Sequence, residues 1–258
     1  MSTKKILCLH GFVQNGPLFA RKSSGVRKAL KKLGYETIFL TAPVKLELAD
    51  LPFDVDSLGG SKDSSESMRS WWPNNVSSPE YYKLDYAFEA IKESIVSDGP
   101  YDGVLGFSQG AGLAGILCQT MHDLHESQPP LKFGIFYSGF RAAPEQHQHF
   151  YKTPISVPSI HIMGSLDTVV SEERTMALFN ACSEETRTMV VHPGGHFVPN
   201  GKDMVTKVIS WLSNVDGSAP ETTNGTVTNS TNSNGNGNGN GNGNAIESWD
   251  EFDKIGAA

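Results

Sequence analysis

The sequence lacks the features of a membrane, secreted or nucleic-acid-binding protein. Its 258 residues contain no apolar run near the roughly 18 residues that a membrane-spanning helix needs, and the apolar run after the N-terminus is too short for a signal peptide. Basic residues are also scarce, because Lys and Arg number 21 against 28 Asp and Glu, with no long basic cluster. We therefore expect a cytoplasmic protein without a membrane span and without a nucleic-acid partner.

Cysteine is scarce as well, and its spacing argues against disulfides and metal sites. The three cysteines are Cys8, Cys118 and Cys182. They lie far apart and form no C-x-x-C pair or Cys/His ligand spacing, so we expect neither a disulfide nor a structural zinc. His147 and His149 could suggest a metal, but no acid or cysteine stands at matching spacing, and we expect solvated loop histidines. No metal and no cofactor is predicted.

Short apolar runs alternate with longer helical patterns along the first 215 residues. The predicted strands are residues 5–9, 35–40, 103–107, 133–137, 159–163 and 188–192. The predicted helices are residues 22–33, 82–97, 109–122, 171–180 and 202–214. This alternation is typical of parallel strands joined by crossover helices. We therefore predict one α/β domain over residues 1–215, built on a six-stranded, mostly parallel sheet flanked by helices.

The composition changes after Val215. Residues 216–245 are rich in Gly, Asn, Ser and Thr and end in an alternating Asn-Gly tract, which predicts a disordered linker. Residues 246–258 form a short acidic-aromatic tail in which an apolar residue recurs every third position, at Ile246, Trp249, Phe252 and Ile255. Two interpretations stay open: a docking peptide for a protein partner, and a weakly ordered tail that touches its own domain or nothing.

The most informative motif is Gly106-Phe107-Ser108-Gln109-Gly110. It follows a predicted strand and opens a predicted helix, and in this setting G-x-S-x-G is a nucleophile elbow. Ser108 then sits in a strained turn with its hydroxyl at the carboxyl edge of the sheet. A serine hydroxyl needs a base to take its proton, and the base needs an orienting acid.

The base and the acid are expected at the same edge of the sheet. In hydrolases of this topology the order along the chain is Ser, then Asp or Glu, then His. Asp167 follows the strand at 159–163, and His196 follows the strand at 188–192, so both should converge on Ser108. His192 is a competitor for the base, but it ends its strand, whereas His196 follows a Gly-Gly turn that frees it to reach Ser108.

Three other carboxylates are weaker candidates for the orienting acid. Asp102 precedes its strand and so belongs to the opposite edge of the sheet. Glu172 and Glu173 start a helix, where the helix dipole already explains an acid. Asp167 therefore keeps the role.

Acyl transfer also needs donors for the oxyanion that forms when a carbonyl is attacked. The backbone N–H after the nucleophile, that of Gln109, is the first candidate, and the N–H of Phe12, after the first strand, is the second. His10 is expected to brace this loop by hydrogen bonding rather than to act in catalysis.

Two predicted connections are long enough to be binding loops, residues 41–80 and 138–158. Both leave the carboxyl ends of strands, where open parallel sheets bind ligands. The aromatic residues expected to line a substrate pocket are Trp71, Trp72, Phe140 and Phe197.

Several separated segments form a pattern that one motif could not supply. They are Leu9-His10-Gly11-Phe12, Gln14-Asn15-Gly16, Lys22-Ser23-Ser24-Gly25, Ala42-Pro43, Asp50-Leu51-Pro52-Phe53, Gly99-Pro100-Tyr101-Asp102-Gly103, Gly106-Phe107-Ser108-Gln109-Gly110 and His192-Pro193-Gly194-Gly195-His196. In these segments the chain resembles the fungal family of serine hydrolases (FSH), which is related to the human ovarian-tumour-suppressor-candidate hydrolase and to some polyketide-releasing thioesterases. The resemblance covers about residues 4–214. It implies an α/β-hydrolase fold with a minimal cap, esterase or thioesterase activity, and a triad of Ser108, Asp167 and His196.

Three functional hypotheses follow. The first is a serine hydrolase that cleaves carboxylic esters through an acyl-enzyme on Ser108. The second is a thioesterase that releases acyl or polyketide chains from a carrier, for which a tethered docking peptide would be suited. The third is a hydrolase fold that binds a small ligand without catalysis, and it is disfavoured because no part of the elbow or triad is missing.

Overall fold

The structure, a computed structural model, describes residues 3–47, 68–73 and 81–218. The predicted linker and tail lie outside these residues except for 216–218, and so does most of the predicted loop 41–80. Within the described residues, no helix is long and apolar enough to cross a membrane. The three cysteines are buried and unpaired. All six predicted strands fall in the described part of the chain.

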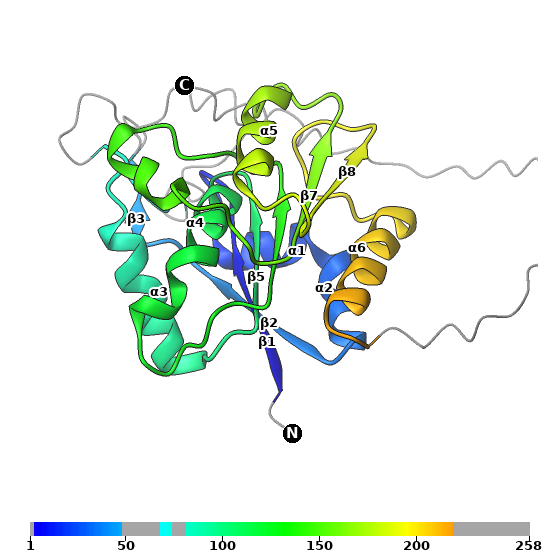
Figure 1. The fold of residues 1–258 in the computed structure, drawn as a ribbon, viewed down its shortest axis with the longest axis horizontal. Helices are drawn as coiled ribbons and strands as arrows, with labels where there is room; N and C mark the ends of the chain where they lie inside the picture. Colours follow the sequence, from blue (N-terminus) through cyan, green and yellow to red (C-terminus); the bar gives the residue numbers. More distant parts are fainter. Residues whose placement is uncertain (1–2, 48–67, 74–80, 219–258) are drawn as a thin grey trace, which may run out of the picture.

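The centre of the fold is a six-stranded sheet in the order β2-β1-β5-β6-β7-β8 (Figure 1). Its strands are β1 Lys4–Leu9, β2 Tyr35–Leu40, β5 Gly103–Phe107, β6 Phe133–Tyr137, β7 Ser159–Gly164 and β8 Arg187–His192. Every neighbouring pair is parallel, so the predicted sheet is confirmed and is fully parallel. A separate antiparallel ribbon pairs β3 Val44–Lys45 with β4 Arg69–Ser70. The order of the sheet reverses between β1 and β5, the point at which such sheets bind ligands.

Helices cover both faces of this sheet. They are α1 Gly16–Lys22, α2 Ser24–Lys32, α3 Asp85–Asp98, α4 Gln109–Leu124, α5 Glu172–Ala181 and α6 Lys202–Val215. Phe19 of α1 and Leu212 of α6 join the apolar core on one face. Ile91 of α3 and Leu178 of α5 join the core on the other face. The result is a three-layer sandwich, in which Figure 1 shows α2 and α3 on opposite sides of the strands.

The first helical region differs from its prediction. The sequence predicted one helix over residues 22–33, whereas α1 and α2 meet at Ser23. Ser23 leaves helical geometry at φ −100° and ψ 23°, and its hydroxyl donates to the Phe19 carbonyl at 2.7 Å. α1 itself was not predicted, although the Asn15 side chain caps it by accepting from the Leu18 N–H and a proline stands in its first turn.

Asp102 closes the amino end of the sheet. Its carboxylate accepts from the Lys5 backbone N–H at 2.9 Å and pairs with the Lys132 ammonium at 2.7 Å. Its own N–H donates to the Lys5 carbonyl at 2.8 Å, and its carbonyl accepts from the Lys132 N–H at 2.7 Å. Asp102 therefore ties β1, β5 and β6 together at the edge opposite to Ser108, which confirms its expected position.

Candidate active site

The nucleophile candidate occupies a strained turn between β5 and α4. Ser108 has φ 51° and ψ −117°, a conformation that is costly for a residue with a side chain. The flanking glycines are required by close backbone contacts. A methyl group on Gly106 would lie 2.4 Å from the Gly110 carbonyl oxygen, and one on Gly110 would lie 2.2 Å from the Leu9 carbonyl oxygen. The elbow therefore packs directly against the end of β1, and Ser108 itself is only 7% exposed.

Asp167 and His196 form a buried pair at the same edge of the sheet. His196 Nδ1 lies 2.8 Å from Asp167 Oδ2, and the two side chains are 6% and 2% exposed. Because a carboxylate can only accept, Nδ1 carries the hydrogen and Nε2 keeps its lone pair. The other carboxylate oxygen, Oδ1, accepts from the N–H groups of Val169 and Val170, each at 2.9 Å. The imidazole is thus held in one orientation and one tautomer.

The loops that carry Asp167 and His196 contact each other through their backbones. The Ser165 N–H donates to the His192 carbonyl at 2.8 Å. Gly164, the last residue of β7, allows a close approach, because a methyl group there would lie 2.4 Å from the Gly195 carbonyl oxygen. The distance between the loops of Asp167 and His196 therefore depends on Gly164, because a side chain there would push the two backbones apart.

Ser138 is a residue of this edge that the sequence reading missed. It follows β6 directly, has φ 46°, and is 1% exposed. Its buried hydroxyl has no hydrogen-bond partner among the described residues. Burial raises the pKa of Asp167, but the hydrogen bond and charge of His196, the Val170 N–H and the nearby Ser138 hydroxyl outweigh burial and hold that pKa below its usual value. The available signal was a serine placed directly after a buried strand.

The competing residues take other roles. His192 accepts from the Gly194 N–H through Nδ1 at 3.2 Å, and its buried Nε2 has no partner in the described part of the chain. Burial lowers the pKa of His192, against the opposing effect of the Asp167 charge. Glu172 and Glu173 lie in the first turn of α5, as expected. Of the two candidate bases, His196 is therefore the one that hydrogen-bonds to the Asp167 carboxylate.

Phe107, the residue before Ser108, packs on His196. The ring of Phe107 lies 4.8 Å from the His196 ring, centroid to centroid. Among the described residues, no hydrogen bond joins the Ser108 hydroxyl to the imidazole. The structure thus brings the acid and the base into direct contact, and Phe107, the residue before Ser108, packs on the base.

Some backbone amides around Ser108 have acceptors and others do not. The Val13 N–H donates to the Arg69 carbonyl at 3.0 Å, and the Ser108 N–H donates to the Tyr137 carbonyl at 2.9 Å. The N–H groups of Phe12 and Gln109 donate to no acceptor within the described ranges. These are the two amides that the sequence predicted for an oxyanion hole. A methyl group on Gly11 would lie 3.4 Å from the Ser108 Cβ, so the loop that carries Phe12 touches the nucleophile turn.

The side chain of His10 braces that loop, as expected. Its Nδ1 donates to the Gly11 carbonyl at 2.7 Å, and its Nε2 accepts from the Ala42 N–H at 3.0 Å. Burial lowers the pKa of His10 to about 4, so the ring is neutral at physiological pH. The Gln109 side chain adds a second brace, because its Oε1 accepts from the Trp71 N–H at 2.9 Å.

The four predicted pocket residues differ in exposure. Trp71 is fully buried, and its Nε1 donates to the His10 carbonyl at 2.8 Å. Trp72 is 1% exposed and meets Phe140 edge to face at 6.5 Å, whereas Phe197 is 40% exposed and packs on His192. Trp71 thus holds the loop that carries His10 and Phe12, and Phe197 offers apolar surface beside His196.

Two histidines were predicted to be solvated, and the prediction is right for His149 and wrong for His147. His149 is exposed, but His147 is buried, stacks on Phe150, and donates through Nε2 to the Tyr82 carbonyl at 2.7 Å. The reason is a 3-10 helix, Glu145–Tyr151, which turns His147 inward from the predicted loop. In the part of the chain that the structure describes, no three His, Cys, Asp or Glu side chains gather as a metal site would require.

Comparisons with known proteins show which proteins the chain resembles. The family profile described as Serine hydrolase (FSH1) matches residues 1–208. Family of serine hydrolases 2 from Saccharomyces cerevisiae is 40% identical over 218 residues, which are 81% of this chain and 98% of that protein. Esterase OVCA2 from Danio rerio is 35% identical over 211 residues, which are 76% of this chain and 90% of that protein. The crystal structure of esterase PE8 shares the fold, with a TM-score of 0.55 and 16% identity over 83% of this chain and 93% of that chain.

Proposed function

The chain belongs to the FSH1 family of serine hydrolases, and from this membership we propose that Ser108, His196 and Asp167 are the catalytic triad of an ester hydrolase. The hydrolase class follows from the family, and the triad is our assignment. The observation that carries it is the buried His196–Asp167 pair at 2.8 Å, beside a serine on a strained turn. Such strain persists where function requires it.

In the first half-reaction, the Ser108 oxygen attacks the carbonyl carbon of the ester. His196 Nε2 accepts the hydroxyl proton while Nδ1–H remains bonded to Asp167, whose negative charge stabilises the imidazolium. When the tetrahedral intermediate collapses, the bond to the leaving oxygen breaks and that oxygen takes the proton from Nε2. An acyl-enzyme on Ser108 and a free alcohol result. The hydrogen bond missing from the resting structure forms when substrate aligns the hydroxyl.

The negative oxygen of the tetrahedral intermediate is bound by the N–H groups of Phe12 and Gln109. Their lack of acceptors among the described residues supports this role, because an unpaired amide at a partly buried site is costly unless it has a ligand. In the second half-reaction a water molecule attacks the acyl carbon while His196 Nε2 takes its proton. When this second tetrahedral intermediate collapses, the bond to the Ser108 oxygen breaks, that oxygen takes the proton from Nε2, and the carboxylic acid is released. The same two amides serve both steps.

The substrate is a carboxylic ester or a thioester, since both pass through the same acyl-enzyme. We assign Phe140 and Phe197 to contact with the acyl chain, with Trp72 behind Phe140. The exposed Leu166, next to Asp167, adds apolar surface for the acyl chain. We also propose a cytoplasmic location, because the three buried thiols are unpaired, as is usual in a reducing compartment.

A chain-length panel tests the proposal. Aryl esters and acyl thioesters of increasing length are assayed with the wild type, with Ser108→Ala, and with Ser97→Ala as a control at an exposed helical serine. The wild type and the control should hydrolyse members of the panel, and Ser108→Ala should lose several powers of ten in kcat/KM. Wild-type protein that turns over no ester and no thioester would instead support the non-catalytic fold.

A further inference from the structure

A basic cavity opens at the amino end of the sheet, at the opposite edge from Ser108. It encloses about 590 Å3 between α2 and the start of β2. Its lining includes three cations, Arg27, Lys28 and Lys31, against one acid, Glu36. None of these four side chains forms a salt bridge with another described residue. The cavity therefore holds positive charge that the described part of the chain leaves unneutralised.

The chain leaves the catalytic domain beside this cavity. α6 ends at Val215, and the next residue, Asp216, pairs with Lys4 Nζ at 3.0 Å and accepts from the Tyr35 hydroxyl at 2.9 Å. Tyr35 lines the basic cavity and also a smaller one, of about 270 Å3, that reaches Asp216. Figure 1 shows the end of α6 and the start of β1 at the same end of the molecule. The C-terminal segment thus starts from the rim of the cavity.

We propose that the basic cavity binds residues 246–255 of this chain's own C-terminal segment. The charges are complementary, because the segment has four acids and one base: Glu247, Asp250, Glu251, Asp253 and Lys254. Its aromatic residues, Trp249 and Phe252, suit the same surface. Lys and Arg present apolar stems and cationic heads, on which aromatic rings pack.

The connecting residues, 219–245, are long enough for this contact. A Gly-rich chain of this length has a root-mean-square span of about 30 Å, comparable with the width of the domain. A tether of this kind gives its end a local concentration on the order of millimolar. Exposed ion pairs are individually weak, but at such a concentration several weak pairs suffice to populate a contact.

The proposed contact lies at the edge of the sheet opposite to Ser108. Because the cavity lies at the amino end of the strands, a bound tail leaves Ser108 uncovered, and turnover of small esters should not depend on it. The family profile ends at residue 208, so the segment is an addition to the shared catalytic domain rather than part of it. The contact is a property of this chain and not of the family fold.

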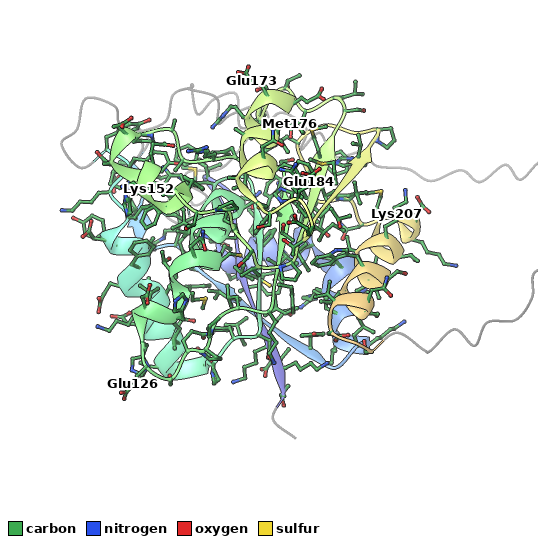
Figure 2. All side chains as sticks on the ribbon, in the orientation of Figure 1. Glu126, Lys152, Glu173, Met176, Glu184 and Lys207 are labelled. Carbon is green, nitrogen blue, oxygen red and sulfur yellow. The ribbon has the colours of Figure 1, made fainter. Side chains whose placement is uncertain are left out.

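Zero-length cross-linking of the full chain tests the proposal. A carbodiimide joins Asp and Glu to lysine amines in direct contact, and peptide mass spectrometry identifies the pairs. We expect the tail acids to join Lys28 and Lys31 at least about threefold more than the exposed Lys92 and Lys152, and the yield to fall at about 0.5 M salt, where charges are screened. Figure 2 shows Lys152 on the far side of the molecule from α2.

Matched variants separate specific from general attraction. Arg27→Glu should lower the yield at Lys28 and Lys31, because Arg27 adds charge to the cavity without being a cross-linking target. Arg21→Glu, the same change at an exposed residue outside the cavity lining, should not. Equal yields at all exposed lysines, or equal effects of the two variants, would overturn the proposal. So would cross-links found only between isotopically light and heavy chains, which would mean that the tail binds a second copy.

Discussion

At the level of single residues, the polar atoms around Ser108, Asp167 and His196 differ in whether they have hydrogen-bond partners. The Asp167 carboxylate is fully engaged, with one oxygen on His196 and the other on two backbone amides. The amides of Phe12 and Gln109 and the hydroxyl of Ser138 are not. Native proteins rarely leave buried polar atoms without partners, so we propose that the two amides bind the substrate oxygen.

The choice between the two histidines is testable by substitution. His196→Ala should lower kcat by several powers of ten, because it removes the base that Asp167 orients. His192→Ala should keep activity within about tenfold, since His192 accepts only a local bond from the Gly194 N–H. Steady-state kinetics on a small aryl ester, with circular dichroism to confirm folding, measures both. The reverse result would mean that His192 is the base.

The effect of the Ser138 hydroxyl on Asp167 can also be tested by substitution. Because it lies near the Asp167 carboxylate and helps to lower its pKa, Ser138→Ala should reduce kcat by about 3- to 10-fold with little change in KM. Ser138→Thr, which keeps a hydroxyl at the same position, should retain most of the activity. Wild-type kcat in Ser138→Ala would show that the hydroxyl plays no part in orienting the acid.

At the scale of elements, the site depends on how closely strand ends and turns approach each other. Gly106 and Gly110 fit the nucleophile turn against β1, and Gly164 fits the Asp167 loop against the His196 turn. These are contacts between backbones, which cannot adjust by changing a rotamer. The residues that we propose for catalysis are therefore positioned by the packing of strand ends and turns as well as by their own side-chain contacts.

Gly164→Ala tests this dependence. Its methyl group would lie 2.4 Å from the Gly195 carbonyl oxygen, so the two loops must separate, and we expect a loss of about 1–3 kcal/mol in stability and more than about tenfold in kcat. Gly201→Ala is the matched control, because nothing lies within 4 Å of the position of its methyl group. Equal activity and equal unfolding midpoints in both variants would contradict the packing argument.

The sequence predicted elements well where local pattern decides them. All six strands were found, because each is a short, mostly apolar run, and β5 and β6 are buried throughout. The two-residue strands β3 and β4 carry no such pattern, and α1 was missed although Asn15 and a proline mark its start. Chain order sufficed to predict that Asp167 and His196 meet. It could not predict Ser138, because its proximity to Asp167 arises only when β6 and β7 pair.

At the scale of the whole molecule, buried histidines couple stability to pH. Burial lowers the pKa of His10 to about 4 and that of His161 to about 3. In the unfolded chain each histidine titrates near about 6.5. Between these values the unfolded state binds protons that the folded state does not, so the free energy of unfolding falls as the pH is lowered through this range.

Denaturant unfolding at about pH 7 and about pH 5 measures this coupling. Each of the two histidines should contribute a loss of about 2 kcal/mol at the lower pH. His161→Phe keeps an aromatic ring between Phe136 and Phe179 but cannot be protonated, so the variant should lose less stability than the wild type over the same interval. A free energy of unfolding that is the same at both pH values would contradict the assigned pKa shifts.

Covalent labelling can show directly whether Ser108 is a nucleophile that His196 and Asp167 activate. A fluorophosphonate reacts only with an activated serine and stays bound to it, so peptide mass spectrometry locates the nucleophile without knowledge of the substrate. We expect a single label on Ser108, formed much more slowly in His196→Ala and in Asp167→Asn, and absent in Ser108→Ala. Labelling of another residue, or unchanged labelling of Ser108→Ala, would contradict this role of Ser108.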